Sequence, residues 1–272
     1  MKRLYCLFII ILYLAISIPS YAQFTINGKH IIYDKQNDTY MACIPEDAFG
    51  KDYEAIILLD IASDWSDLSI DGTQIAYSYT FKQVEGNKLY SIHARKGNKE
   101  INTKITFTFL PLLVLQGSFG YDYAQGSMSL YSPDATEPTI SLIKAKWRGG
   151  STNTADKHKR NYKIKSINFK GKSQDISLLG MREDNNWIMD AGQIDLFRLR
   201  NRIATEIWND FATKPYYASK EPKAKSGVTG KVVEVILNNE YRGIYSLTEA
   251  MDRKELKLKK YDDKNQEFHG QL

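Results

Sequence analysis

Residues 232–248, with the sequence VVEVILNNEYRGIYSLT, carry a strong β-strand signal. Two segments rich in β-branched and aromatic residues, 232–237 and 241–248, are separated by the turn Asn238-Asn239-Glu240. Such residues favour strands, and a short asparagine-containing turn between two strands is typical of a hairpin. The sequence therefore predicts a β-hairpin at this position.

A helical pattern precedes the hairpin. It opens at Asp195 and places apolar side chains on one helical stripe, at Leu196, Leu199, Ile203 and Ile207. Four more apolar residues lie beside that stripe: Phe197, Ala204, Trp208 and Phe211. This pattern predicts one helix with a clearly apolar face. Before the helix, segments 139–148 and 162–169 are predicted strands that flank a polar loop at 149–154.

The first half of the chain has an all-β pattern. Its short alternating segments are separated by turns such as Asn27-Gly28 and Asp71-Gly72, and a sandwich is their simplest packing. The predicted strands are 30–33, 54–59, 69–70, 75–81, 89–93, 104–110, 112–116 and 127–131. The polar, proline-bounded segment 132–138 is the predicted boundary. The expected fold is α+β, with a signal peptide at 1–22, a β-sandwich-like module at 23–138 and a second domain at 139–272.

The N-terminus has the pattern of a secretory signal peptide. Lys2 and Arg3 precede an apolar run at 4–18, and small residues at Ser20 and Ala22 suit cleavage after Ala22. The alternative is a membrane anchor, but the run of 15 residues is short of the ~20 needed to span a bilayer. We expect a secreted, extracytoplasmic protein, in the periplasm or at the cell surface, with no transmembrane helix after cleavage.

Composition excludes several classes of protein. The 272 residues are 43% hydrophobic and 25% charged, which is typical of a folded globular protein. Two cysteines and four scattered histidines provide neither a disulfide framework nor a zinc-ligand pattern. The net charge falls from +5 to +3 once Lys2 and Arg3 are removed, which does not argue for nucleic-acid binding.

Basic residues nevertheless cluster between Lys144 and Lys172, where Asp156 is the only acidic residue. A charge run is usually a solvated surface, but this one contains the turn Arg148-Gly149-Gly150-Ser151. Glycines let backbone N–H groups approach a phosphate, and Arg148 adds a positive charge. The hairpin could therefore bind an anion, and the ordinary alternative is a Gly-Gly turn with solvated lysines. Lys163 and Lys165 share one side of the following strand, and the sequence does not choose between them.

Several segments together resemble the spore-coat protein CotH family. The resemblance covers roughly residues 144–253 and rests on the order and spacing of RGGS at 148–151, KRNYKIK at 159–165, WIM at 187–189, LRNRIA at 199–204 and EVILNNEYRGIYSLTE at 234–249. It implies the small lobe of an atypical protein-kinase-like fold that binds ATP with Mg or Mn and acts on a protein substrate.

The resemblance also implies roles for single residues. Residues Arg148 to Ser151 would cover the phosphates, and Lys163 or Lys165 would act as the strand lysine. Glu206, on the helix, would hold that lysine, unless it is simply a surface carboxylate. Glu249 would lie at a hinge near the adenine, unless it is a polar cap on a strand end.

The sequence departs from the family after Glu249. The remaining 23 residues contain no catalytic or metal-binding aspartate motif of the kinase type. We therefore expect the N-terminal portion of a CotH-like kinase, as a fragment or a natural truncation, inactive in this form and without catalytic or metal-binding residues of its own. The missing partner lobe would leave apolar residues such as Ile244 and Leu247 exposed. The alternative function is a non-catalytic, secreted or surface-associated module that binds a protein or glycan.

Overall fold

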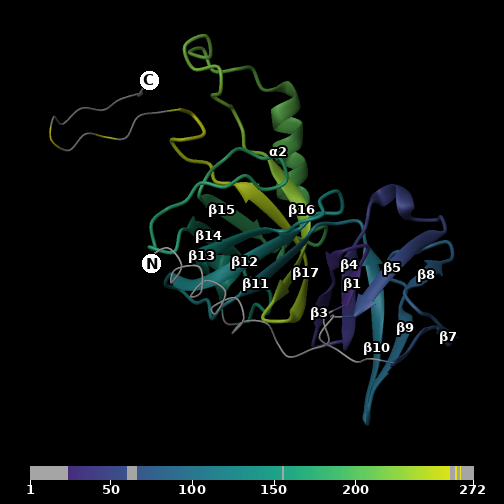
Figure 1. Cartoon of the computed structure of the whole chain (residues 1–272). Helices are drawn as coiled ribbons and strands as arrows, with labels where there is room; N and C mark the ends of the chain where they lie inside the picture. Colours follow the sequence, from purple (N-terminus) through teal and green to yellow (C-terminus); the bar gives the residue numbers. More distant parts are fainter. Residues whose placement is uncertain (1–23, 60–65, 155, 258–260, 262–263, 265–272) are drawn as a thin grey trace, which may run out of the picture.

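The computed structural model describes residues 24–59, 66–154, 156–257, 261 and 264 (Figure 1). The predicted signal peptide and its cleavage site lie outside these residues. Among the described residues, no helix is long and apolar enough to cross a membrane. Figure 1 shows two β-rich parts side by side, with one α-helix standing over the second.

The first part is a sandwich of two sheets. One sheet has the strand order β2 (Lys29–His30), β1 (Phe24–Ile26), β5 (Tyr53–Leu59) and β8 (Ser78–Phe81). The other has the order β3 (Ile32–Asp34), β4 (Thr39–Cys43), β10 (Lys99–Thr108), β9 (Tyr90–Lys96), β6 (Ser66–Ile70) and β7 (Thr73–Gln74). Both sheets contribute to one core. At its centre the ring of Phe81 meets those of Phe107 and Tyr90 edge to face, with centroids 4.8 and 4.9 Å away.

The second part is a closed seven-stranded barrel. Its strand order is β11 (Leu112–Gln116), β12 (Ala124–Tyr131), β13 (Thr139–Trp147), β14 (Tyr162–Ile167), β15 (Asn186–Asp190), β17 (Glu240–Glu249) and β16 (Gly230–Leu237). β11 and β16 run parallel and close the barrel, whereas the other neighbours are antiparallel. Inward side chains such as Met128, Trp187 and Met189 are fully buried, so the interior is a packed core.

The prediction of a β-rich fold with little helix is confirmed, and so is the hairpin of β16 and β17. One assignment differs. Segments 112–116 and 127–131 were expected in the sandwich, but as β11 and β12 they belong to the barrel, so the change of sheet falls between Thr108 and Leu112 rather than at 132–138. Alternation predicts that a segment is a strand, but the choice of sheet depends on partners far away in the chain.

The helix α2 (Arg200–Phe211) is present but begins later than predicted, because Asp195 shapes a turn before it. The Asp195 carboxylate accepts hydrogen bonds from the backbone N–H groups of Phe197 and Arg200, at 3.1 and 2.9 Å. The apolar side chains of α2 are exposed: Phe211 is 65% exposed and Ile207 54%. Arg202, at 4%, is the buried residue of the helix.

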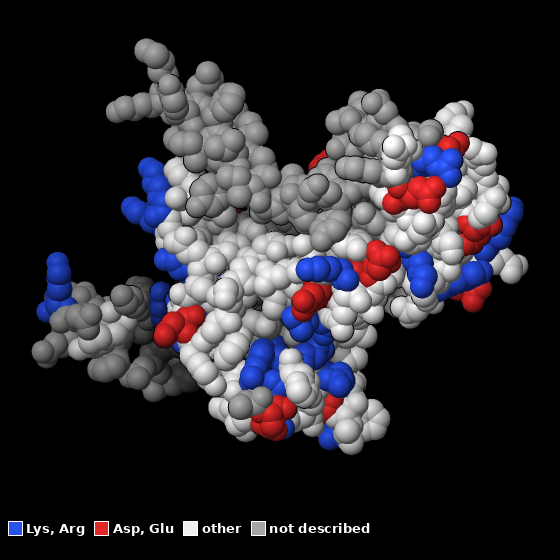
Figure 2. All heavy atoms as spheres, turned by 90° about the horizontal axis from the view of Figure 1, so that it is seen from below, with Lys and Arg blue, Asp and Glu red and all other residues white. Residues whose placement is uncertain are grey.

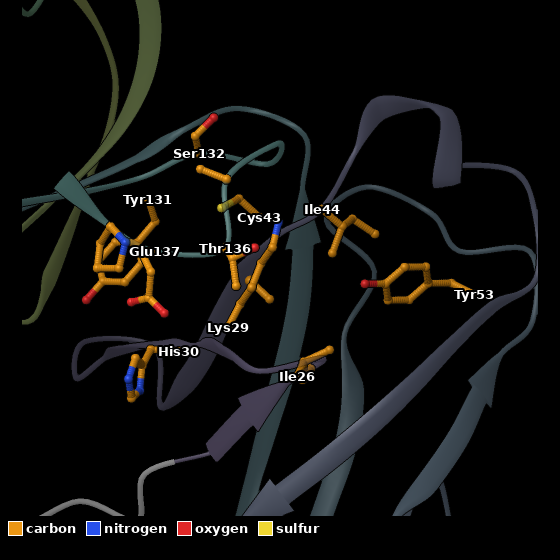
Figure 3. Close-up of a pocket in the computed structure, with 13 residues that line it drawn as sticks. Ile26, Lys29, His30, Cys43, Ile44, Tyr53, Tyr131, Ser132, Thr136 and Glu137 are labelled. Atoms are coloured by element: carbon orange, nitrogen blue, oxygen red, sulfur yellow. The ribbon is translucent and has the colours of Figure 1, made fainter. Parts of the chain in front are cut away.

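The sandwich and the barrel meet along a small apolar cluster of Met41, Cys43, Leu112 and Ile236. Beside it, the Asp34 carboxylate accepts from the backbone N–H of Tyr241 at 3.1 Å. Figure 3 shows a pocket at the same junction, where Lys29 and Cys43 point toward the segment that carries Ser132 and Thr136. Its free space of about 10 Å³ holds no more than a water molecule, so the junction is packed rather than open to a ligand.

Candidate functional site

The loop between β13 and β14 is closed by its own polar groups. The backbone N–H of Arg148 donates to the carbonyl of Asn161 at 2.9 Å, and the side-chain amide of Asn153 donates to the carbonyl of Gly149 at 3.2 Å. The side-chain amide of Asn161 donates a hydrogen bond to Thr152 Oγ1 at 3.3 Å. Its oxygen accepts a hydrogen bond from the backbone N–H of Ala191 at 2.7 Å. The loop is therefore fastened to both of its own ends and to the end of β15.

The two glycines of this loop have different requirements. Gly149 has φ +101°, and a Cβ placed there would lie 2.1 Å from Thr152 Oγ1. Gly150 has φ −88°, and nothing lies within 4 Å of its Cβ position. Only Gly149 needs to be glycine on steric grounds. Arg148, both glycines and Ser151 all lie exposed at the tip of the loop, where a ligand can reach them.

Lys163 and Lys165 lie together on the outer face of the barrel. Their neighbours Tyr162 and Ile164 are buried inside, so both lysines point outward. Lys163 pairs with Lys146 and Lys165 with Lys144 on β13, which makes a group of four half-buried lysines, here called the lysine face. The choice between Lys163 and Lys165 stays open because they share this face.

An aromatic ring covers part of the lysine face. The ring of Tyr123 has the ammonium groups of Lys165 and Lys146 at 4.8 and 5.1 Å from its centroid. These cation–π contacts hold two like charges close together. Tyr123 could not be recognised from the sequence, because only the pairing of β12 with β13 brings it beside these lysines.

Glu206 is not brought to the predicted lysine. Its side chain is 58% exposed and forms an ion pair with Arg202 of the same helix, with 3.0 Å between Arg202 Nε and Glu206 Oε1. The guanidinium of Arg202 lies over Gly230, where a Cβ would be 2.3 Å from Nη1. Sequence reasoning missed Arg202 because it stands in the middle of an apolar pattern.

Glu249 is a buried carboxylate at the end of β17. It accepts from the backbone N–H groups of Arg182 and Thr229, at 2.8 and 2.7 Å, and pairs with Lys225 at 3.2 Å. Burial acts to raise the pKa of Glu249, but these hydrogen bonds and the positive charge lower it below the ordinary 4.5. These contacts fit the interpretation of a polar cap, since both oxygens already have partners.

The residues fit a phosphate better than they fit a metal ion. The lysine face and the open loop tip offer positive charge and accessible backbone for an anion. By contrast, the described part of the chain holds no group of three or more His, Cys, Asp or Glu side chains arranged to bind a metal ion.

Comparison with known proteins adds one finding. Residues 145–270 match the family described as CotH kinase protein. The match begins within β13 and includes the loop, the lysines of β14, α2 and the β16–β17 hairpin. A search of curated proteins found no match to the chain.

Proposed function

Because residues 145–270 are a region of the CotH kinase protein family, we propose that they bind the phosphates of ATP as the small lobe of a kinase-like protein that acts on proteins. The observation that supports this best is the lysine face next to a loop whose exposed tip contains Gly149 and Gly150. When bound, ATP would supply the phosphoryl group, and Mg or Mn would neutralise its charge.

The lysines come from an unusual strand for a kinase. In protein kinases the nucleotide-binding lysine lies on the third strand, one strand after the pair that flanks the glycine-rich loop. Here the third strand is β15, with the sequence NWIMD, which contains no lysine. Lys163 and Lys165 stand on β14 beside Ile188 and Asn186 of β15. We propose that β14 supplies the lysine that β15 lacks.

The described residues support binding of the nucleotide rather than a complete transfer reaction. Glu206 is paired with Arg202, so it does not hold Lys163 or Lys165 in this arrangement. The carboxylates needed for the metal ions are not grouped in the described part of the chain. We therefore expect the 272-residue chain to bind ATP without phosphorylating a protein, and we propose that it acts outside the cytoplasm after cleavage near Ala22.

ATP titration of the 272-residue chain tests this proposal. The double variant Lys163→Met/Lys165→Met is expected to bind a fluorescent ATP analogue at least about tenfold more weakly, because it removes two of four charges from the lysine face. The matched control is Lys104→Met, on β10 of the sandwich. Equal affinity of the double variant and the unchanged chain would overturn the proposal, and phosphate transfer to a protein by the chain would contradict the expected inactivity.

A second candidate function is the binding of a protein or glycan by the sandwich. A hollow of about 360 Å³ lies over β6, β9 and β10, lined mostly by hydroxyl, amide and imidazole groups such as those of Ser91, His93 and Asn102. Such groups donate and accept hydrogen bonds to the hydroxyls of sugars. Glycan-array binding that is lost in Asn102→Leu but kept in Lys163→Met/Lys165→Met would favour this function.

A further inference from the structure

A cavity of about 440 Å³ opens at one end of the barrel, away from the lysine face. Three segments surround it: the loop after β11, the loop between β13 and β14, and the β16–β17 hairpin. The turn of that hairpin lies at the lower end of the barrel in Figure 1. Figure 2 looks at the molecule from below and shows a group of Lys and Arg side chains on this side of it, with Asp and Glu side chains at its edges.

The rim of the cavity is positively charged. It carries Lys157, Arg160 and Arg242, and no aspartate or glutamate lines it. Asp156 and Glu240 pair with Lys157 and Arg242 from outside the lining, at 2.6 and 2.5 Å. Arg160 is held by the carbonyl of Thr154, at 2.7 Å. Among the described residues, no carboxylate forms an ion pair with Arg160, so its guanidinium is available to an anion.

The floor of the cavity is formed by phenols. Tyr162 and Tyr245 point into the barrel and are 5% and 2% exposed. Burial raises the pKa of both hydroxyls, which stay protonated at neutral pH as hydrogen-bond donors. The positive charges of Arg242 and Arg160 act on the pKa of Tyr162 in the opposite direction and offset part of the effect of burial.

The walls of the cavity are aromatic. Trp147 and Phe119 line it, and the guanidinium of Arg160 lies 4.8 Å from the centre of the Trp147 ring. An arginine held on an aromatic ring keeps its fork of N–H donors in a fixed orientation. The two rings form the apolar part of a lining that is otherwise mostly polar and basic, so the hollow suits an anion that also carries a ring.

We propose that this cavity binds a small organic anion in which a phosphate or sulfate ester is joined to a flat ring. Arg160 and Arg242 would bind the ester oxygens, the phenols of Tyr162 and Tyr245 would donate to it from the floor, and the ring would lie against Trp147 and Phe119. The site is separate from the lysine face because Tyr162 and Lys163, neighbours on β14, point to opposite sides of the barrel wall.

The test is a calorimetric titration of the 272-residue chain with 4-nitrophenyl phosphate and, separately, with 4-nitrophenyl sulfate. Binding of either ester with clearly higher affinity than inorganic phosphate supports the site, and the two arms tell which ester it prefers. The variant Arg160→Gln/Arg242→Gln is expected to bind about tenfold more weakly or worse. Both arginines lie at the rim, and near-UV circular dichroism checks that the variant is folded.

Two controls separate this site from the lysine face. Arg148→Gln removes a nearby exposed arginine outside the lining and is expected to leave ester binding unchanged, and so is Lys163→Met/Lys165→Met. No binding of either ester at ~1 mM would overturn the inference. It would also be overturned if the lysine variant lost ester binding while the arginine variant kept it, whatever the outcome of the ATP titration.

Discussion

Thr108, the last residue of sandwich strand β10, donates a hydrogen bond from Oγ1 to Oε1 of Glu234 in barrel strand β16, at 3.1 Å. Both side chains are buried. Because β11 follows β10 directly and pairs with β16, this contact lies where the chain passes from one core to the other. Because this position holds a carboxyl group, the stability of the junction between the two parts should depend on pH.

Glu234→Gln should change how stability depends on pH. Burial raises the pKa of Glu234 above its ordinary 4.5, and hydrogen bonds from Thr108 and Tyr241 offset only part of this. The folded protein thus holds this proton more tightly than the unfolded chain, so its contribution is lost as the pH rises through the folded pKa. Glutamine keeps the acceptor oxygen and cannot ionise.

The measurement is urea unfolding at several pH values. From about pH 4 to about pH 8, the variant is expected to gain unfolding free energy relative to the unchanged chain, and the gain should grow as the pH rises. Glu54→Gln, at an exposed position on β5, is the control. A constant difference between Glu234→Gln and the unchanged chain across this range would contradict the prediction.

Glu249→Gln should have the opposite pH dependence. The folded pKa of Glu249 is lowered, so its stabilisation is present above the ordinary value of 4.5 and is lost as the pH falls through the folded pKa. At neutral pH the variant breaks a buried ion pair and is expected to lose about 2 kcal/mol or more of unfolding free energy. Denaturant unfolding at about pH 7 and about pH 3 checks this, with Glu183→Gln as an exposed control. An equal loss at both pH values would count against it.

The local parts of the fold could be read from the sequence because short turns determine them. The turn residues Asn238 and Asn239 have φ values of +52° and +64°, as a tight hairpin requires, and Asn27-Gly28 and Asp71-Gly72 also have positive φ. The long-range parts could not be read in this way. Leu112 pairs with Glu234, and no local pattern identifies such a partner. Leu247, expected on an exposed face, is fully buried inside the barrel, whereas Ile244 is 39% exposed.

The candidate site was predictable to a similar extent. Alternation correctly placed Lys163 and Lys165 on one side of their strand, since Tyr162 and Ile164 face the core. The partners of Glu206 and Glu249 depend on tertiary packing, as do the phenols beneath Arg160 and Arg242. A charge run in sequence therefore located a basic region but did not separate the lysine face from the cavity at the barrel end.

Replacing each glycine of the β13–β14 loop by alanine should give different results. Gly149→Ala forces a Cβ against Thr152 Oγ1 at a backbone conformation that L-residues rarely adopt, so we expect a loss of about 1–2 kcal/mol in stability and weaker ATP binding. Gly150→Ala meets open space at negative φ and should be nearly neutral. Thermal unfolding and ATP titration of the pair measure both effects. Equal behaviour of the two variants would show that the loop is not fastened as described.

The helix α2 should depend more on its buried arginine than on its apolar residues. Arg202 packs over Gly230 and pairs with Glu206, whereas Ile207 is half exposed. Arg202→Ala removes a buried, paired group and is expected to lose about 2 kcal/mol or more. Ile207→Ala should stay within about 0.5 kcal/mol, because little apolar burial is lost and alanine is the better helix former. Urea unfolding of both variants decides the matter: a larger loss for Ile207→Ala than for Arg202→Ala would mean that the apolar face of α2 packs on the barrel after all.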